Sequence, residues 1–406
     1  MICYAIWVVK KVISICREKY VVFLLFLTTL FYLLMYLSSW WPLRIQNVGG
    51  GHSYEDLKFV FQYADCNFGN IEVSLKDCPL PSYQYGMILL EILRYMSITQ
   101  LPLAFIGALL ITLVILAFYK IINIVQPKTF LVFIYIASPA LWLLFERGNI
   151  DSLIFILLFL AALTLSTRFE IIGVFLIALS ALVKFYTLPI LLIVPFIVKN
   201  KIVKITSVLF FLALVPIVFI NMRAIEAFPF PMFTAFGSPA PGLWLNFFSW
   251  RFNLGFKLSD LESHFIGIFL YSITTLLLLT NKSLQNKIGL MALNVVNNRT
   301  NILCTVFTST YLITYLAGMN FDYRLVYLIA SLILYSKINS ELFRNKIFQI
   351  LAISSLWMTY FFFGFTGAVP VIFMIIGNIS QGLIASILTC EIIFRSQLYR
   401  KLIHSF

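Results

Sequence analysis

The sequence predicts an all-α polytopic membrane protein. Of its 406 residues, 61% are hydrophobic and 11% are charged, and the mean hydropathy is +0.97. A soluble domain of this length cannot bury so much apolar surface, whereas a lipid bilayer covers it. Apolar runs recur along the chain between short polar loops. No internal repeat and no soluble domain interrupts them, so residues 1–406 are expected to form one integral membrane domain.

The apolar runs predict a bundle of about twelve transmembrane helices. They lie at 21–37, 102–119, 129–145, 150–166, 171–183, 187–198, 202–220, 264–280, 301–318, 324–336, 347–363 and 369–392. Residues 1–20 are basic and amphipathic, which predicts a cytoplasmic interfacial segment. The first run is too long for a signal-peptide core and precedes no cleavage site, so it is expected to remain as a span. Both termini are then cytoplasmic in a multi-pass cell-membrane protein, and a bacterial plasma membrane is expected.

Residues 171–198 are short for two spans and long for one. A single helix would bury Lys184 near the middle of the bilayer and would move Lys199, Lys201 and Lys204 to the outer side. Two short helices that meet near Lys184 avoid both problems, and Pro189 suits the start of the second. The sequence therefore favours a hairpin.

Two long loops are expected on the extracytoplasmic side, at 40–101 and 221–263. In the first, residues 54–66 predict an amphipathic helix, because four apolar residues recur at helical spacing: Leu57, Val60, Phe61 and Ala64. We expect this helix to lie at the membrane face and to hold Asp56 over an active site. The second loop is rich in aromatic residues, Pro and Gly, which suits a lid, a rim in contact with lipid, or an ordinary packed loop. Cys66 and Cys78 share the first loop, where they either pair or remain two thiols.

Several classes of function fit the sequence poorly. The net charge of +13 is spread among short loops, which is the positive-inside pattern, so nucleic-acid binding is not expected. The three histidines lie in separate segments without metal-ligand spacing, and no Walker loop, dinucleotide fingerprint or Asp-x-Asp pair occurs. The sequence therefore predicts neither a metal nor a cofactor.

Four polar groups are expected on one side of the membrane. They are Asp56, the segment Glu146-Arg-Gly-Asn-Ile-Asp151, Lys184 with Tyr186, and the segment Asn320-Phe-Asp-Tyr-Arg324. Ionisable residues so close to hydrocarbon usually line a cavity or pair with one another.

Each group also has a purely structural interpretation. Ser53-x-x-Asp56 matches a helix capping box, and Lys184 can extend to the interface. Arg147 can pair with Glu146, Asp151 or Asp322, and Asp322 can instead pair with Arg324. The convergence of four segments favours a site.

A carboxylate among several cations suits sugar transfer from a lipid phosphate. The carboxylate takes the proton of the acceptor hydroxyl, and cations hold the phosphate as negative charge develops on it. Arg147, Lys184 and Arg324 are the predicted partners of the donor phosphate.

At these residues the chain resembles glycosyltransferase family 87 of the GT-C superfamily, over about residues 20 to 340. Asp56-Leu-Lys-Phe-Val-Phe-Gln-Tyr-Ala is similar to the family's Asp-Phe-x-Val-Tyr-Tyr-x-Ala-Ala pattern. Tyr83-Gln-Tyr-Gly86 resembles the following Tyr-Pro-Pro segment, although Gly86 stands where proline is usual.

The resemblance implies a GT-C-like helical bundle and an inverting transfer on the extracytoplasmic face. Polyprenyl-phosphate mannose or another hexose would be the donor, and a lipid- or glycan-linked molecule the acceptor. It implies Asp56 as the catalytic base, and we expect substrate contacts at Asn149, Asp151, Tyr186 and Asp322. The alternatives are a flippase or transporter for a lipid-linked glycan, and a glycan polymerase or ligase.

Overall fold

The computed structural model describes residues 55–65, 87–127, 130–226, 255, 260–290, 298–316, 324–358 and 368–395. All regular structure in these ranges is helical, and none of the described residues forms a strand. The elements in chain order are α2 (Glu55–Asp65), α4 (Met87–Tyr95), η2 (Ile98–Gln100), α5 (Leu103–Val125), α6 (Leu131–Ile136), α7 (Pro139–Arg147), α8 (Asp151–Leu165), α9 (Glu170–Val183), η3 (Phe185–Thr187), α10 (Ile190–Ile197), α11 (Lys201–Glu226), α13 (Asp260–Thr280), α14 (Lys282–Ile288), α15 (Asn298–Leu316), α16 (Leu325–Ile338), α17 (Ser340–Arg344), α18 (Lys346–Trp357) and α19 (Ala368–Arg395).

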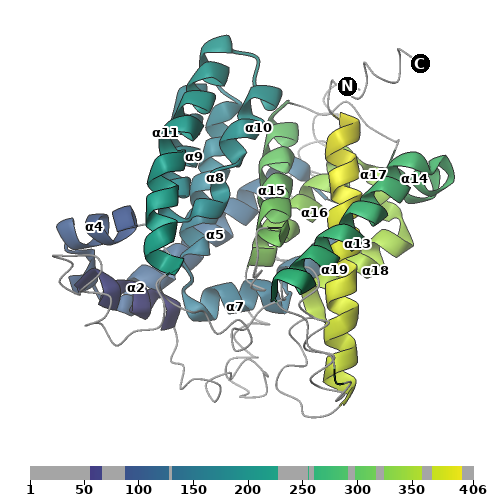
Figure 1. Ribbon diagram of the computed structural model, residues 1–406, viewed down its shortest axis with the longest axis horizontal. Coiled ribbons are helices and arrows are strands. Elements are labelled where there is room, and N and C mark those ends of the chain that lie inside the picture. Colours follow the sequence, from purple (N-terminus) through teal and green to yellow (C-terminus); the bar gives the residue numbers. More distant parts are fainter. Residues whose placement is uncertain are drawn as a thin grey trace, which may run out of the picture.

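The helices form a bundle with smaller helices at its ends (Figure 1). Helices α8 to α11 stand side by side, α15 and α16 follow, and α13 packs with α19 on the far side. Helices α2 and α7 lie across the lower end of the bundle in this view. The core runs through the middle of the bundle, where α8, α15 and α16 bury most of their side chains.

Several helices suit a bilayer in length and composition. Among the described residues, three are long and apolar enough to cross a membrane: Leu103–Val125, Lys201–Val218 and Ile375–Arg395. The number rises to five if each of two bent helix pairs counts as one span. Large apolar side chains also face outward from the bundle, such as Phe105, Leu209 and Phe269, which are 59%, 59% and 63% exposed. A bilayer around the bundle would remove the cost of that exposure.

The amphipathic helix predicted at 54–66 is confirmed as α2. Its four apolar positions, Leu57, Val60, Phe61 and Ala64, are all buried. They pack toward α4, η2, α5 and α7, so the hydrophobic effect holds the helix flat against the end of the bundle.

The hairpin predicted at 171–198 is also present. Helix α9 ends at Val183, the backbone of Lys184 is extended, and α10 begins directly after Pro189. Figure 1 shows α10 beside α9, and not beyond its end. Helices α8 and α9 approach closely at Gly173, where an added Cβ would lie 2.6 Å from Leu165 Cγ.

The span expected at 129–145 is interrupted. The chain forms two short helices there, α6 and α7, and α7 lies across the end of the bundle. The break falls before Pro139, because proline disfavours the helical conformation in the preceding residue and then starts a new helix well. Ser138 is accordingly extended, with ψ 150°.

The other expected spans from 102 onward each overlap one helix, namely α5, α8, α11, α13, α15, α16, α18 and α19. Helix α11 reaches Glu226 and α13 begins at Asp260, so both extend into the loop expected at 221–263. The interfacial segment at 1–20, the span at 21–37, most of both long loops, Cys66, Cys78 and Asp322 lie outside the described residues.

Candidate active site

Asp56 lies in the first turn of α2 and faces the turn between α7 and α8. Its Oδ1 accepts two hydrogen bonds from Arg147, one from Nε at 2.9 Å and one from Nη2 at 2.5 Å. Its Oδ2 accepts a third, from Asn149 Nδ2 at 2.5 Å. Both oxygens are thereby oriented by residues 91 and 93 positions away in sequence.

The backbone conformation of the turn between α7 and α8 positions Arg147 and Asn149 against Asp56. Gly148 ends α7 in the left-handed conformation, with φ 57°, which glycine adopts without steric cost. The chain can therefore turn at once into α8. Asn149 Oδ1 then accepts from the backbone N–H of Asp151 at 2.9 Å, which satisfies one of the free donors at the start of that helix.

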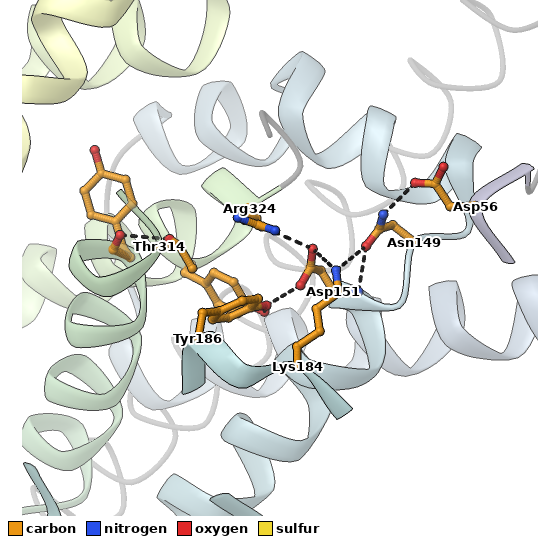
Figure 2. Close-up of polar contacts among 9 residues, drawn as sticks. Asp56, Asn149, Asp151, Lys184, Tyr186, Thr314 and Arg324 are labelled. Carbon is orange, nitrogen blue, oxygen red and sulfur yellow. Dashed lines mark hydrogen bonds and ion pairs between the residues drawn. The ribbon is translucent and has the colours of Figure 1, made fainter. Parts of the chain in front are cut away.

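Asp151 is the fully buried centre of the site (Figure 2). Its Oδ2 accepts from Lys184 Nζ at 2.8 Å and lies 3.7 Å from Arg324 Nε. Its Oδ1 accepts from Tyr186 OH. A buried carboxylate needs such partners, because an isolated charge is poorly solvated away from water.

Aromatic side chains close the inner side of the site. The Arg324 guanidinium lies over the Tyr186 ring, 5.0 Å from its centroid, which is a favourable cation–π geometry. Tyr186 OH also shares a hydrogen bond of 2.8 Å with Tyr327 OH. Tyr327 is not among the site residues predicted from the sequence. It follows Arg324 by three residues on the helical start of α16, and that spacing is the signal that could have found it.

Exposure divides the site into an outer and an inner part. The side chains of Arg147 and Asp56 are 23% and 12% exposed, whereas those of Lys184 and Asp151 are 5% and 0% exposed. Lys184 lies in the turn between α9 and α10, where burial lowers the pKa of its ammonium group to about 8 against the opposing effect of Asp151. The outer part is thus partly open to solvent, and the charges of the inner part lie buried behind it.

The structure brings together seven of the eight predicted site residues. Asp56, Arg147, Asn149, Asp151, Lys184, Tyr186 and Arg324 form one connected network, and Asp322 lies outside the described residues.

One structural interpretation of these residues is wrong, because Lys184 turns inward to Asp151 and does not extend to the interface. Arg147 pairs with Asp56, a partner that was not among those predicted, and its predicted partner Asp322 lies outside the described residues. The Asp56 carboxylate takes its hydrogen bonds from side chains, and none of the described backbone N–H groups donates to it.

No group of three His, Cys, Asp or Glu side chains within the described ranges is arranged to hold a metal ion. Comparisons with known proteins gave no matching family model, no similar curated protein and no similar solved structure. Any conclusion about function therefore rests on the site itself.

Proposed function

We propose that this chain is an inverting glycosyltransferase. It moves a sugar, mannose or another hexose, from a polyprenyl-phosphate donor to a lipid- or glycan-linked acceptor on the extracytoplasmic face of the membrane. The observation that carries the proposal is the convergence of Asp56 with Arg147, Lys184 and Arg324 at one end of an apolar helical bundle. The resemblance to glycosyltransferase family 87 agrees with it.

Asp56 is the proposed general base. A carboxylate oxygen accepts about two hydrogen bonds. Arg147 supplies two to Oδ1, whereas Oδ2 accepts one from Asn149 among the described contacts. Oδ2 is therefore the atom that takes the acceptor's proton. As it does so, the acceptor oxygen bonds to the anomeric carbon, and the bond from that carbon to the phosphate oxygen breaks.

The three cations are the proposed site for the donor phosphate. The leaving polyprenyl phosphate carries away the bonding electron pair, so negative charge on it grows through the transition state. Arg147 is the most exposed of the three, and its planar guanidinium, which holds Asp56 through Nε and Nη2, is shared with the phosphate oxygens, while Lys184 and Arg324 act from the buried side.

The proposed topology is a GT-C-like bundle of about twelve spans with the site at its outer end. Helix α9 descends to Lys184 and α10 returns, so the connection to Lys201 lies at the end opposite the site. The basic helix α14, which carries Lys282 and Lys287, lies in the upper part of the view, away from α2 and α7 (Figure 1). That segregation of charge supports a cytoplasmic end opposite the site.

A flippase or transporter for a lipid-linked glycan fits the interior of the bundle less well. Such a protein carries charged groups along a path between the two faces. In the described residues the buried charged side chains are Asp151 and Lys184 in the site, and Glu391, which pairs with Arg395 in the last two turns of α19. The core next to the site is filled by a stack of aromatic rings, Phe118, Phe155 and Phe307.

The test is to incubate purified protein with polyprenyl-phosphate mannose and candidate acceptors, and to measure released polyprenyl phosphate. Asp56→Asn keeps the shape of the side chain but removes its basicity, so release is expected to fall at least 100-fold, a typical contribution of a general base. Asp65→Asn, on the exposed end of the same helix, is the matched control. Near-normal turnover by Asp56→Asn contradicts the assignment. Activity only with a lipid-linked oligosaccharide donor points to a polymerase or ligase.

A further inference from the structure

We propose that Asn149 is a positioning residue, which fixes the base Asp56 relative to Lys184 and Asp151 without touching the substrate. This inference rests on the proposed function. Asn149 is a predicted substrate contact, but the residue is fully buried. It contacts the outer part of the site on one side and the inner part on the other, as Figure 2 shows.

The hydrogen bonds of Asn149 determine the orientation of its amide. Its Oδ1 accepts from two donors, the backbone N–H of Asp151 at 2.9 Å and Lys184 Nζ at 3.3 Å. Its Nδ2 donates to Asp56 Oδ2 at 2.5 Å. If the two amide atoms were exchanged, Nδ2 would face the Asp151 N–H and the Lys184 ammonium, which are also donors. Oδ1 would face the Asp56 carboxylate, which is also an acceptor. Only one orientation satisfies the site.

This arrangement requires an amide. A carboxylate at position 149 can accept from Lys184, but it places a second negative charge beside Asp56. An apolar side chain leaves Asp56 Oδ2 and Lys184 Nζ each without one of their hydrogen bonds. The planar Asn149 amide therefore links the Asp56 carboxylate to the Lys184 ammonium group. It fixes the distance between the proposed base and this phosphate partner.

The inference predicts a specific kinetic pattern. In Asn149→Ala the cations remain, so binding of polyprenyl phosphate should change by less than about threefold, while kcat falls roughly 10- to 100-fold because a hydrogen bond to a charged group is lost. In Asn149→Asp, kcat should be low at neutral pH and recover in part at acidic pH. There the introduced carboxyl group is protonated and can donate to Asp56, as the amide does.

Asn345→Ala is the matched control. Asn345 is also an asparagine that accepts from backbone N–H groups at the start of a helix, Ile347 N at 2.9 Å and Phe348 N at 3.2 Å, but it lies outside the site. Its replacement should lower the melting temperature and leave kcat and the pH profile unchanged. A structural role for Asn149 predicts the same behaviour in Asn149→Ala. That result, or a wild-type pH profile in Asn149→Asp, overturns the inference.

One further measurement separates this inference from the proposed function. If the wild-type protein releases no lipid phosphate, the proposed function fails, and the rate of carbodiimide modification at Asp56 then tests the geometry alone. Loss of the Asn149 donor exposes Asp56 Oδ2, so Asn149→Ala should be modified several-fold faster than the wild type at that residue. Equal rates overturn the inference in that case as well.

Discussion

Replacement of Arg147 by lysine tests how the outer cation acts. The change keeps the positive charge but removes the planar fork, which gives two hydrogen bonds to Asp56 Oδ1, at 2.9 and 2.5 Å. A lysine ammonium at this position can keep one of them. We therefore expect Arg147→Lys to orient both Asp56 and the donor phosphate less well.

The size of the effect follows from the number and exposure of these bonds. Loss of one hydrogen bond to a charged group costs about 1.5–3 kcal/mol. This corresponds to a roughly 10- to 150-fold lower kcat/KM, since each 1.36 kcal/mol is a factor of ten. The Arg147 and Asp56 side chains are 23% and 12% exposed, so water replaces part of the lost interaction and the lower end, about tenfold, is expected.

The assay compares the release of polyprenyl phosphate per folded molecule with thermal stability. Arg168→Lys is the matched control, because Arg168 is exposed in the connection between α8 and α9 and its guanidinium contacts the Phe169 ring at 4.9 Å. A lower melting temperature in Arg147→Lys with normal activity per folded molecule would refute the reasoning. It would mean that Arg147 serves only to attach α2 to the bundle.

Two other predictions concern charge and topology. Burial lowers the pKa of Lys184 to about 8, so its positive charge is present below that pH and is lost above it. The KM for the donor should therefore rise roughly tenfold from pH 7 to pH 9. Lys184→Arg should abolish this rise. A wild-type KM that does not change with pH contradicts the role of Lys184. A cysteine at Tyr95, which is 92% exposed on the side of the site, should react with an impermeant thiol reagent added outside, whereas one at Lys201 should not. Labelling at Lys201 but not at Tyr95 would reverse the proposed orientation, and labelling at both would mean that 171–198 crosses the membrane once.

Local patterns predicted the helices well, because each depends on residues close in sequence. The spacing of apolar residues in α2 is enough to identify its buried face, and Pro189 marks the start of α10. The break between α6 and α7 has an equally local cause, the pair Ser138-Pro139, but the apolar run around it conceals the break when only hydropathy is considered.

The partners within the site could not be predicted in the same way. The sequence predicts that Arg147 and Asp56 lie on one side of the membrane, but not that they meet. They are 91 positions apart, and only the packing of α2 against α4, η2, α5 and α7 brings them together. Asn149 is a similar case. Between two charged residues of a polar turn it is typical of a substrate contact, and its complete burial is a property of the tertiary structure alone.

The close approach of α8 and α9 has a consequence for the ion pair at their far ends. A Cβ at position 173 would lie 2.6 Å from Leu165 Cγ and 2.8 Å from the Ala161 carbonyl oxygen. The two helices are therefore in direct contact there and leave no room for a side chain. Lys184 follows eleven residues later, about 16 Å along the helix axis at 1.5 Å per residue. With the crossing point as a pivot, a tilt of about 5° would swing Lys184 by about 1.4 Å over that length. Such a swing is half of the 2.8 Å that separates Lys184 Nζ from Asp151 Oδ2. The position of the Lys184 ammonium relative to the Asp151 carboxylate is thus determined by a helix crossing that contains no charged atom.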